Sequence, residues 1–212
     1  MKILVKDLKK SVKGVSILEN INLEFESGKI YGLYGRNGSG KTMLLRCLAG
    51  MLNYNSGTIM YNEKCLHKDI DIAPNAGVII ENVGFWGMYT GFENLKMLAG
   101  IRKKIDDKRI RETLKLVGLD PADKRVVAKY SLGMRQRLAI AQALMEYPDV
   151  LLLDEPTNAL DEEGVEEFRK LLLKEKEKGT IVIIASHNKE DMSVLADVKL
   201  HMVNGKVKIE EA

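Results

Sequence analysis

The segment that most constrains the fold is Gly-Arg-Asn-Gly-Ser-Gly-Lys-Thr at positions 35–42. An apolar run at 30–34 precedes it and residues 43–52 follow with apolar side chains at helical spacing, so the order is strand, loop, helix. Glycines let such a loop curl so that backbone N–H groups point at phosphate oxygens, while Lys41 reaches the β- and γ-phosphates and the Thr42 hydroxyl holds Mg²⁺. The alternative is a Gly-rich turn without a ligand. The segment predicts a nucleoside triphosphate site made by Gly35, Asn37, Gly38, Ser39, Gly40, Lys41, Thr42 and Met43.

Composition narrows the class of protein. The chain has 212 residues, of which 45% are apolar, enough for one large core or for a core with a smaller inserted subdomain. Lys and Arg number 33 against 30 Asp and Glu. These charges are interspersed, without the basic block and interleaved aromatics that are typical of nucleic-acid grooves. We therefore expect no nucleic-acid partner.

Two observations concern the cell compartment. Cys47 and Cys65 lack C-x-x-C spacing, which favours reduced thiols in a cytosolic protein over a disulfide framework. No uninterrupted apolar stretch approaches the ~18 residues that span a bilayer, and the apolar run at the N-terminus is too short for a signal peptide. Any membrane role would therefore require a separate partner chain.

Hydrophobic patterning changes twice along the chain. The first sixty residues read as strands, partly antiparallel, and residues of about 85–145 read as helices. Beyond residue 149, continuous apolar runs alternate with a helix and end in a hairpin: 150–153, 162–178, 181–185 and Asn204-Gly205. Continuous runs suit strands that are buried on both faces. We predict a single α/β domain over 1–212, with a phosphate-loop core and a mostly parallel sheet, an N-terminal antiparallel β part and an inserted helical subdomain at about 85–145.

Three predicted strands end in residues with useful chemistry. The strand at 30–34 leads into the phosphate loop, the strand at 150–153 into Asp154-Glu155, and the strand at 181–185 into Ser186-His187. Ligands of parallel sheets bind at the carboxyl ends of the strands, so neighbouring strands would bring all three groups to one triphosphate. Asp154 is then the expected Mg²⁺ ligand, Glu155 the base or water-positioning residue, and His187 a donor to the γ-phosphate. The alternative for Asp154-Glu155, taken alone, is a solvated acidic pair at the end of a strand. The alternative for a lone histidine is a structural role.

A second candidate anion site lies at Ser131 and Gly133, where a predicted helix opens. Unpaired N–H groups and the positive end of the helix dipole face outward there. Taken alone this is an ordinary helix start. A chain with one phosphate site needs a second only if the second serves the nucleotide of another copy.

These motifs, in this order and over nearly the whole chain, resemble ATP-binding cassette (ABC) transporter ATPases. Residues 35–42 resemble the Walker A loop, 130–134 the signature segment, 150–155 the Walker B segment and 158–161 the D-loop, and His187 resembles the switch histidine. The resemblance implies ATP and Mg²⁺ as cofactors. It also implies a head-to-tail pair of cassettes, with a second copy or a related ABC ATPase, in which Ser131 and Gly133 touch the γ-phosphate bound by the facing subunit.

Three positions depart from the family pattern. Val12 aligns best with the aromatic residue that usually stacks on adenine, so base stacking should be weaker. The signature segment reads Ser-Leu-Gly-Met where Ser-Gly-Gly-Gln is commonest, which keeps Ser131 and Gly133. Glu81 stands where the family carries the Q-loop glutamine; it can approach Mg²⁺ or accept from water but cannot donate as an amide does. A glutamate there resembles small exporters that confer bacitracin resistance or lantibiotic self-immunity.

Four aromatic residues follow Glu81 closely: Phe85, Trp86, Tyr89 and Phe92. They are either a core for the helical subdomain or, as the family implies, a cleft that receives a helix of a membrane subunit. We expect an ATP-hydrolysing subunit at the cytoplasmic face of the cell membrane that powers a separate transmembrane permease, with export favoured over import. The alternatives are a soluble ATP-gated switch, which usually has two cassettes or a long coiled coil, and a metabolic phosphoryl-transfer enzyme, which leaves the signature unexplained.

Overall fold

Strands of the chain form two separate sheets. The computed structural model describes residues 1–81, 83–187 and 195–211. The first sheet is antiparallel and has the order β2-β1-β4-β5. Its strands are β1 (Lys2–Val12), β2 (Val15–Glu26), β4 (Ser56–Tyr61) and β5 (Lys64–Cys65). In β2 the buried side chains alternate with exposed ones, which confirms the predicted antiparallel β part.

The second sheet has six strands in the order β10-β9-β3-β8-β7-β6 and is parallel except for β10. Its strands are β3 (Ile30–Tyr34), β6 (Ala76–Ile79), β7 (Val150–Asp154), β8 (Ile181–Ala185), β9 (Val198–Val203) and β10 (Lys206–Glu211). The turn between β9 and β10 contains Asn204 and Gly205 with φ of 48° and 76°, as a two-residue hairpin requires. The predicted mostly parallel sheet is therefore confirmed, and the antiparallel β10 makes it a mixed sheet.

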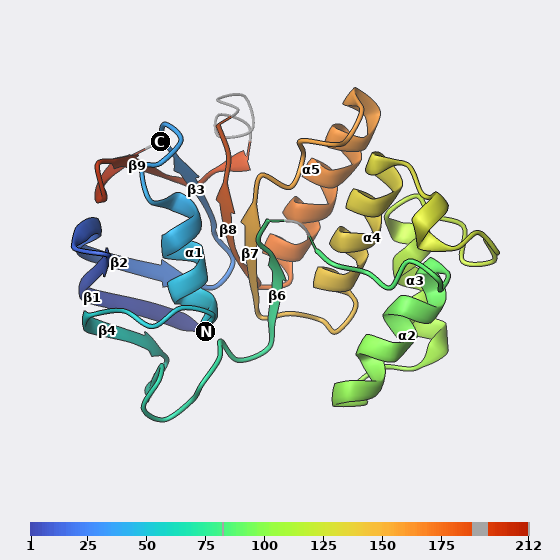
Figure 1. Cartoon of the computed structure of the whole chain (residues 1–212), viewed down its shortest axis with the longest axis horizontal. Coiled ribbons are helices and arrows are strands. Elements are labelled where there is room, and N and C mark those ends of the chain that lie inside the picture. The colour runs from blue at the N-terminus through green and yellow to red at the C-terminus, as the bar shows by residue number, and fades with distance from the viewer. Residues whose placement is uncertain (82, 188–194, 212) are drawn as a thin grey trace.

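Alternate residues of the central strands enter two different hydrophobic cores. Leu151 and Leu153 of β7 pack in a first core with α2 (Gly91–Arg102), α3 (Asp107–Leu116), α4 (Leu132–Leu144) and α5 (Glu162–Glu177). Val150 and Leu152 pack in a second core with α1 (Lys41–Ala49) and the antiparallel sheet. Figure 1 shows α1 on one side of β7 and β8 and helices α4 and α5 on the other. Because both faces are covered, these strands are apolar throughout.

The described residues between β6 and β7 form three α-helices, α2, α3 and α4, in the range predicted to be helical. Thr90 caps α2, and its side chain and that of Glu93 form a capping box. A short 3₁₀ helix, Val127–Lys129, precedes α4. Helix α4 packs against both α3 and β6, so the first core joins these helices to the sheet.

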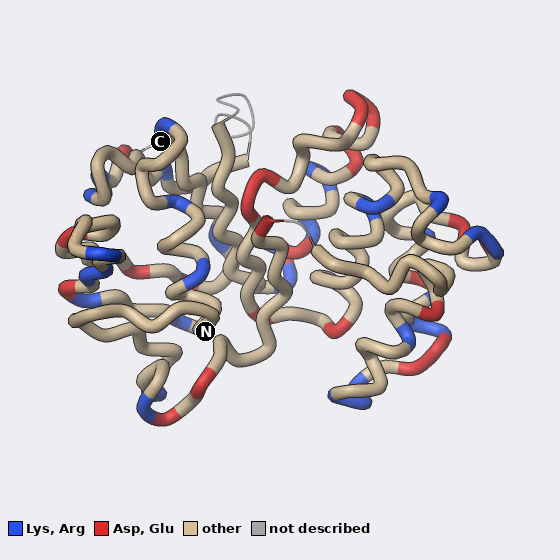
Figure 2. The backbone as a smooth tube through the Cα atoms, in the orientation of Figure 1, with Lys and Arg blue, Asp and Glu red and all other residues tan. Residues whose placement is uncertain are grey.

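Helix α1 begins earlier than its apolar spacing indicated, at Lys41, and it ends at Ala49 rather than near residue 52. Gly50 ends it with a φ of 80°, and a Cβ at that position would lie 2.6 Å from the carbonyl oxygen of Asp71. Among the described residues, no helix is long and apolar enough to cross a membrane. Basic and acidic residues lie among one another over both halves of the chain (Figure 2).

Candidate nucleotide-binding site

The three strands that carry the predicted site residues are neighbours. Strand β8 pairs in parallel with β3 on one side and with β7 on the other, so their carboxyl ends meet at one edge. There the residues enclose a hollow of about 440 Å³, within the range of small-molecule sites. Its lining residues come from the phosphate loop, α1, β2 and the ends of β6 and β7: Ile17, Asn37, Gly38, Ser39, Gly40, Lys41, Thr42, Met43, Arg46, Glu81, Asp154 and Glu155.

The phosphate loop (residues 35–42) depends on glycine at its tightest point. Gly35 has a φ of 153°, and a Cβ there would lie 2.2 Å from the carbonyl oxygen of Met202. Lys41 is buried, and its ammonium donates to the carbonyl oxygen of Gly35 at 2.8 Å. Among residues 1–81, 83–187 and 195–211, no side chain caps α1, whose N-cap is Gly40, and the buried Ser39 Oγ has no hydrogen-bond partner. This leaves donors at a helix N-terminus for an anion.

Thr42 and Asp154 meet across the hollow. The Thr42 hydroxyl donates to Asp154 Oδ2 at 2.6 Å, although the two residues are 112 positions apart. Burial is the main cause that raises the pKa of Asp154 above its ordinary value, and the charges of Glu155 and Glu81 add to it, while the Thr42 hydrogen bond and Lys41 oppose it. A hydroxyl and a carboxylate are hard oxygen ligands, and a divalent cation would relieve the crowding of negative charge. This donor set fits Mg²⁺.

Glu155 and His187 also lie together. His187 Nδ1 is 2.8 Å from Glu155 Oε2, and the backbone N–H of Glu155 donates to Ala185 at the end of β8. Glu155 has a φ of 47°, in the left-handed region that few side chains adopt. The carboxylate of Glu155 is 23% exposed and the imidazole of His187 is 63% exposed. Glu155 thus lines the hollow, and His187, which is not one of its lining residues, lies beside Glu155, where water can reach both.

Two lining residues were missed by sequence reasoning. Arg46 is one turn beyond Thr42 on α1 and forms an ion pair with Glu81, with Nη2 2.5 Å from Oε2. Its position four residues after Thr42 was the available signal. Ile17 of β2 lines the hollow, whereas Val12, predicted to meet the base, lies at the end of β1 beside the hairpin to β2, 39% exposed, and is not a lining residue.

The signature segment (residues 130–134) lies elsewhere. Ser131 is the N-cap of α4, and its hydroxyl accepts from the N–H of Met134 at 3.2 Å. Ser131 and Leu132 are exposed, and neither Ser131 nor Gly133 lines the hollow. A Cβ at Gly133 would lie 3.0 Å from the carbonyl oxygen of Ala159 in the D-loop (residues 158–161). The segment therefore presents a capped helix N-terminus outward, next to the D-loop.

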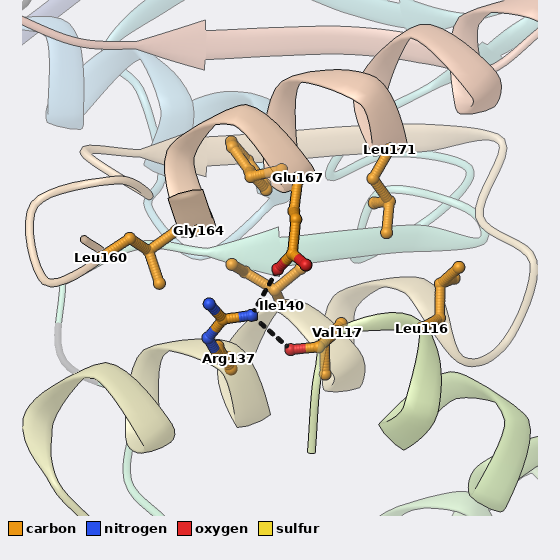
Figure 3. A pocket seen from close by; sticks show the side chains of 9 residues that line it. Leu116, Val117, Arg137, Ile140, Leu160, Gly164, Glu167 and Leu171 are labelled. Atoms are coloured by element: carbon orange, nitrogen blue, oxygen red, sulfur yellow. Dashed lines mark hydrogen bonds and ion pairs between the residues drawn. The ribbon is translucent and has the colours of Figure 1, made fainter. Parts of the chain in front are cut away.

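Arg137 fastens the signature helix α4 to its neighbours, as Figure 3 shows. Its guanidinium donates to Glu167 Oε2 at 2.8 Å and to the carbonyl oxygen of Val117 at 3.0 Å, and reaches Asp161 Oδ1 at 3.5 Å. Gly164 leaves room beside it, since a Cβ there would come within 2.8 Å of a guanidinium nitrogen, which would have to shift. One residue earlier, Gln136 donates to the carbonyl oxygen of Pro156 at 2.7 Å. Helix α4 is thus connected to the segment that follows Glu155.

The four aromatic residues after Glu81 divide into two pairs. Phe85 and Phe92 pack against the first core. Trp86 and Tyr89 are 50% and 39% exposed, and Met88 between them is 77% exposed. The core and surface interpretations therefore apply to different members of the group.

Comparisons with known proteins agree with these features. A sequence model of the ABC transporter family matches residues 18–158, more than half of the chain. YybJ of Bacillus subtilis, an uncharacterized ABC transporter ATP-binding protein, is 48% identical over 207 residues, which cover 98% of this chain and 95% of YybJ. The lantibiotic transport ATP-binding protein SrtF of Streptococcus pyogenes is 35% identical over 208 residues, 98% of this chain and 89% of SrtF.

Two further relatives complete the comparison. The bacitracin transport ATP-binding protein BcrA of Bacillus licheniformis is 40% identical over 196 residues, 90% of this chain and 63% of BcrA. The dimeric structure of MJ0796, a bacterial ABC transporter cassette, superposes with a TM-score of 0.89 at 25% identity, over 99% of this chain and 98% of that one. The chain therefore belongs to the ABC transporter family, as an ATP-binding subunit that hydrolyses ATP.

Proposed function

We propose that the chain binds Mg²⁺-ATP in the hollow, pairs head to tail with a second cassette around two ATP molecules, and powers a separate permease at the cytoplasmic face of the membrane. One observation carries the proposal: Lys41, Thr42, Asp154 and Glu155 line one hollow, while Ser131 is exposed outside it. The chain thus has one hollow with phosphate and metal ligands and, apart from it, one helix N-terminus without a nucleotide of its own.

Within one subunit the residues divide the chemistry. Lys41 and the free N–H groups of the loop hold the phosphates, and Thr42 with Asp154 would hold Mg²⁺, which neutralises charge on the β- and γ-phosphates when bound. Glu155 orients a water and accepts its proton as the water oxygen bonds to the γ-phosphorus. The bond from that phosphorus to the ADP oxygen breaks, which gives ADP and phosphate. His187, 2.8 Å from Glu155, keeps the carboxylate directed at that water.

The second subunit supplies the other half of the site. Ser131 and Gly133 of the facing cassette would donate to the γ-phosphate, as the helix N-terminus and its exposure allow. The dimeric cassette MJ0796 supports this arrangement. ATP then joins the two subunits and its hydrolysis separates them, which is a ligand-driven shift between two states.

A permease would contact the exposed apolar patch formed by Trp86, Met88 and Tyr89. These residues follow Glu81, so a partner bound there lies one short segment from the nucleotide. The names of BcrA and SrtF, which are bacitracin and lantibiotic transport proteins, support export of a peptide antibiotic of that kind.

The test is the variant Glu155→Gln, whose amide cannot accept the proton. We expect ATP affinity to be retained, kcat to fall about 10²–10⁴-fold, and a dimer to accumulate with ATP in size-exclusion chromatography. Parent-like hydrolysis would exclude Glu155 as the proton acceptor.

Docking has its own test, co-purification of a permease from membranes. Trp86→Ala with Met88→Ala should lose the permease, whereas Ile209→Ala, which alters an exposed side chain on β10, should keep it. A soluble switch would bring no membrane protein in any of these samples.

A further inference from the structure

Glu81 is held by a positive charge on the helix that also carries the expected metal ligand Thr42. The carboxylate lies just beyond β6, and Arg46 Nη2 is 2.5 Å from its Oε2. The two side chains are 31% and 60% exposed, Arg46 being the more buried, and both line the nucleotide hollow. The ion pair is therefore part of the site wall, where a bound nucleotide and its cation would meet it.

Three carboxylates surround this part of the hollow: Glu81, Asp154 and Glu155. Like charges this close repel one another when no cation lies between them. Arg46 offsets that repulsion at Glu81. No three His, Cys, Asp or Glu side chains of the described part of the chain are grouped so that they could hold a metal ion together. In the conformation shown, Glu81 is thus directed to the guanidinium and not to a shared metal position.

The geometry of α1 gives Arg46 its reach. Thr42 and Arg46 are four residues apart and lie on the same face of the helix, about one turn or ~6 Å from each other. A cation held by Thr42 and Asp154 would therefore lie within reach of the same carboxylate that Arg46 now holds. Glu81 has a φ of 57°, a conformation that neighbouring contacts must maintain. The guanidinium is such a contact.

We propose that Arg46 is a positioning residue that competes with the bound Mg²⁺ for Glu81. While Arg46 holds Glu81, the carboxylate is withheld from the metal; when it is released, Glu81 joins Thr42 and Asp154 on the cation side of the hollow. The proposal rests on the proposed function, since it uses the same metal site. Its consequence is that the Arg46–Glu81 pair sets how strongly Mg²⁺ assists nucleotide binding.

The experiment measures the Mg²⁺ coupling, defined as the Kd of a fluorescent, non-hydrolysable ATP analogue in EDTA divided by its Kd in Mg²⁺. Arg46→Gln should raise this ratio about threefold to fivefold, which is the size expected for releasing a partly exposed ion pair. Arg46→Lys keeps a charge for Glu81 and should stay near the parent ratio. As a matched control, Arg102→Gln breaks an ion pair with Glu146, outside the hollow, and should leave the ratio unchanged.

A double-mutant cycle separates Glu81 from a general charge effect. In a Glu81→Gln background, Arg46→Gln should no longer change the ratio, because the carboxylate for which the two cations compete is absent. An equal rise in both backgrounds would mean that Arg46 merely repels Mg²⁺, and would overturn the proposal, as would an unchanged or lowered ratio for Arg46→Gln alone.

The failure of the proposed function would look different. A parent protein that binds the analogue equally well with and without Mg²⁺ would contradict the metal site itself, and this proposal with it. A parent with clear coupling, whose Arg46 variants all match it, would contradict only the role of Arg46. Circular dichroism spectra of each variant, compared with the parent, show that the fold is retained.

Discussion

The phosphate loop and the signature segment both lead into helix N-termini, but the two helix ends differ in capping and in burial. At α1 the cap is Gly40, Lys41 and Ser39 are buried, and no side chain from the described part of the chain accepts from the first N–H groups. At α4, Ser131 already caps the helix and is exposed. A buried, uncapped helix end is organised around a ligand of its own chain, because its donors would otherwise lack partners. An exposed, capped one is stable alone and can meet a ligand that another molecule brings.

The strongest way to break this comparison is to damage each end in a different subunit. Lys41→Ala should abolish ATP-driven pairing of a subunit with itself, and Ser131→Arg should do the same, each weakening association about 10²-fold or more. A mixture of the two variants contains dimers with one intact site. These mixed dimers should recover ATP-dependent pairing, measured as energy transfer between differently labelled subunits. If the mixture pairs no better than either variant alone, the two helix ends do not act across subunits.

The next largest effect concerns only the nucleotide hollow and not the signature segment. His187→Asn removes the imidazole beside Glu155, so kcat should fall about 10²-fold while KM for ATP changes little. Steady-state phosphate release measures both. His67→Asn, at a position with φ of 65° outside the hollow, is the matched control and should behave as the parent. A parent-like kcat for His187→Asn would remove the imidazole from the mechanism.

A smaller effect is expected at Arg137, which holds the signature helix α4 to its neighbours. Arg137→Gln leaves Glu167 and the Val117 carbonyl without their donor, which should lower the free energy of unfolding by about 2 kcal/mol in urea titration. The cost should exceed that of Arg102→Gln, because the Arg102 side chain is 40% exposed, whereas that of Arg137 is 19% exposed and also donates to a backbone carbonyl. ATP-driven pairing should weaken as well, because α4 loses its attachment to the D-loop. Equal stability losses in the two variants would show that Arg137 is an ordinary surface residue.

The smallest expected effect is an increase in stability, caused by replacing Asp154. Asp154 has a raised pKa in the folded protein, so between the unfolded and folded values the native state binds more protons, and stability decreases as pH rises through the folded pKa. Asp154→Asn removes this contribution. Without nucleotide, its Tm should be about 2 °C above the parent at neutral pH, and the difference should vanish in acid. With Mg²⁺-ATP, the parent should gain stability that the variant lacks. A lower Tm for the nucleotide-free variant would contradict the pKa argument.

Much of the site was predictable because its chemistry is local in sequence. The phosphate loop, Asp154-Glu155 and His187 each directly follow an apolar run, so only the order of the strands remained to be found, and β3, β8 and β7 proved adjacent. Their roles in binding and catalysis remain predictions. Contacts that join distant segments were not predictable: Arg46 with Glu81 depends on how α1 faces the end of β6.

The same reason explains the other omissions. Ile17 reaches the hollow because of the length of the β1–β2 hairpin, and nothing in the local pattern separates it from Val12 as a neighbour of the nucleotide. Arg137 looks like any basic residue on a helix until α5 packs beside it and Gly164 leaves room for its guanidinium. Helix and strand patterns report which side of an element is apolar, whereas these contacts depend on the relative placement of two elements.

Alternate side chains of β7 enter two different cores, so the number of residues in this strand before Asp154 is as constrained as the identity of Asp154. Leu151 and Leu153 belong to the first core, and Val150 and Leu152 to the second. Inserting one residue in this strand would send each of these side chains to the wrong core and rotate the carboxylate away from Thr42. An alignment gap inside β7 is therefore incompatible with a working site, and a change of length near Asp154 must fall in the loops that flank this strand.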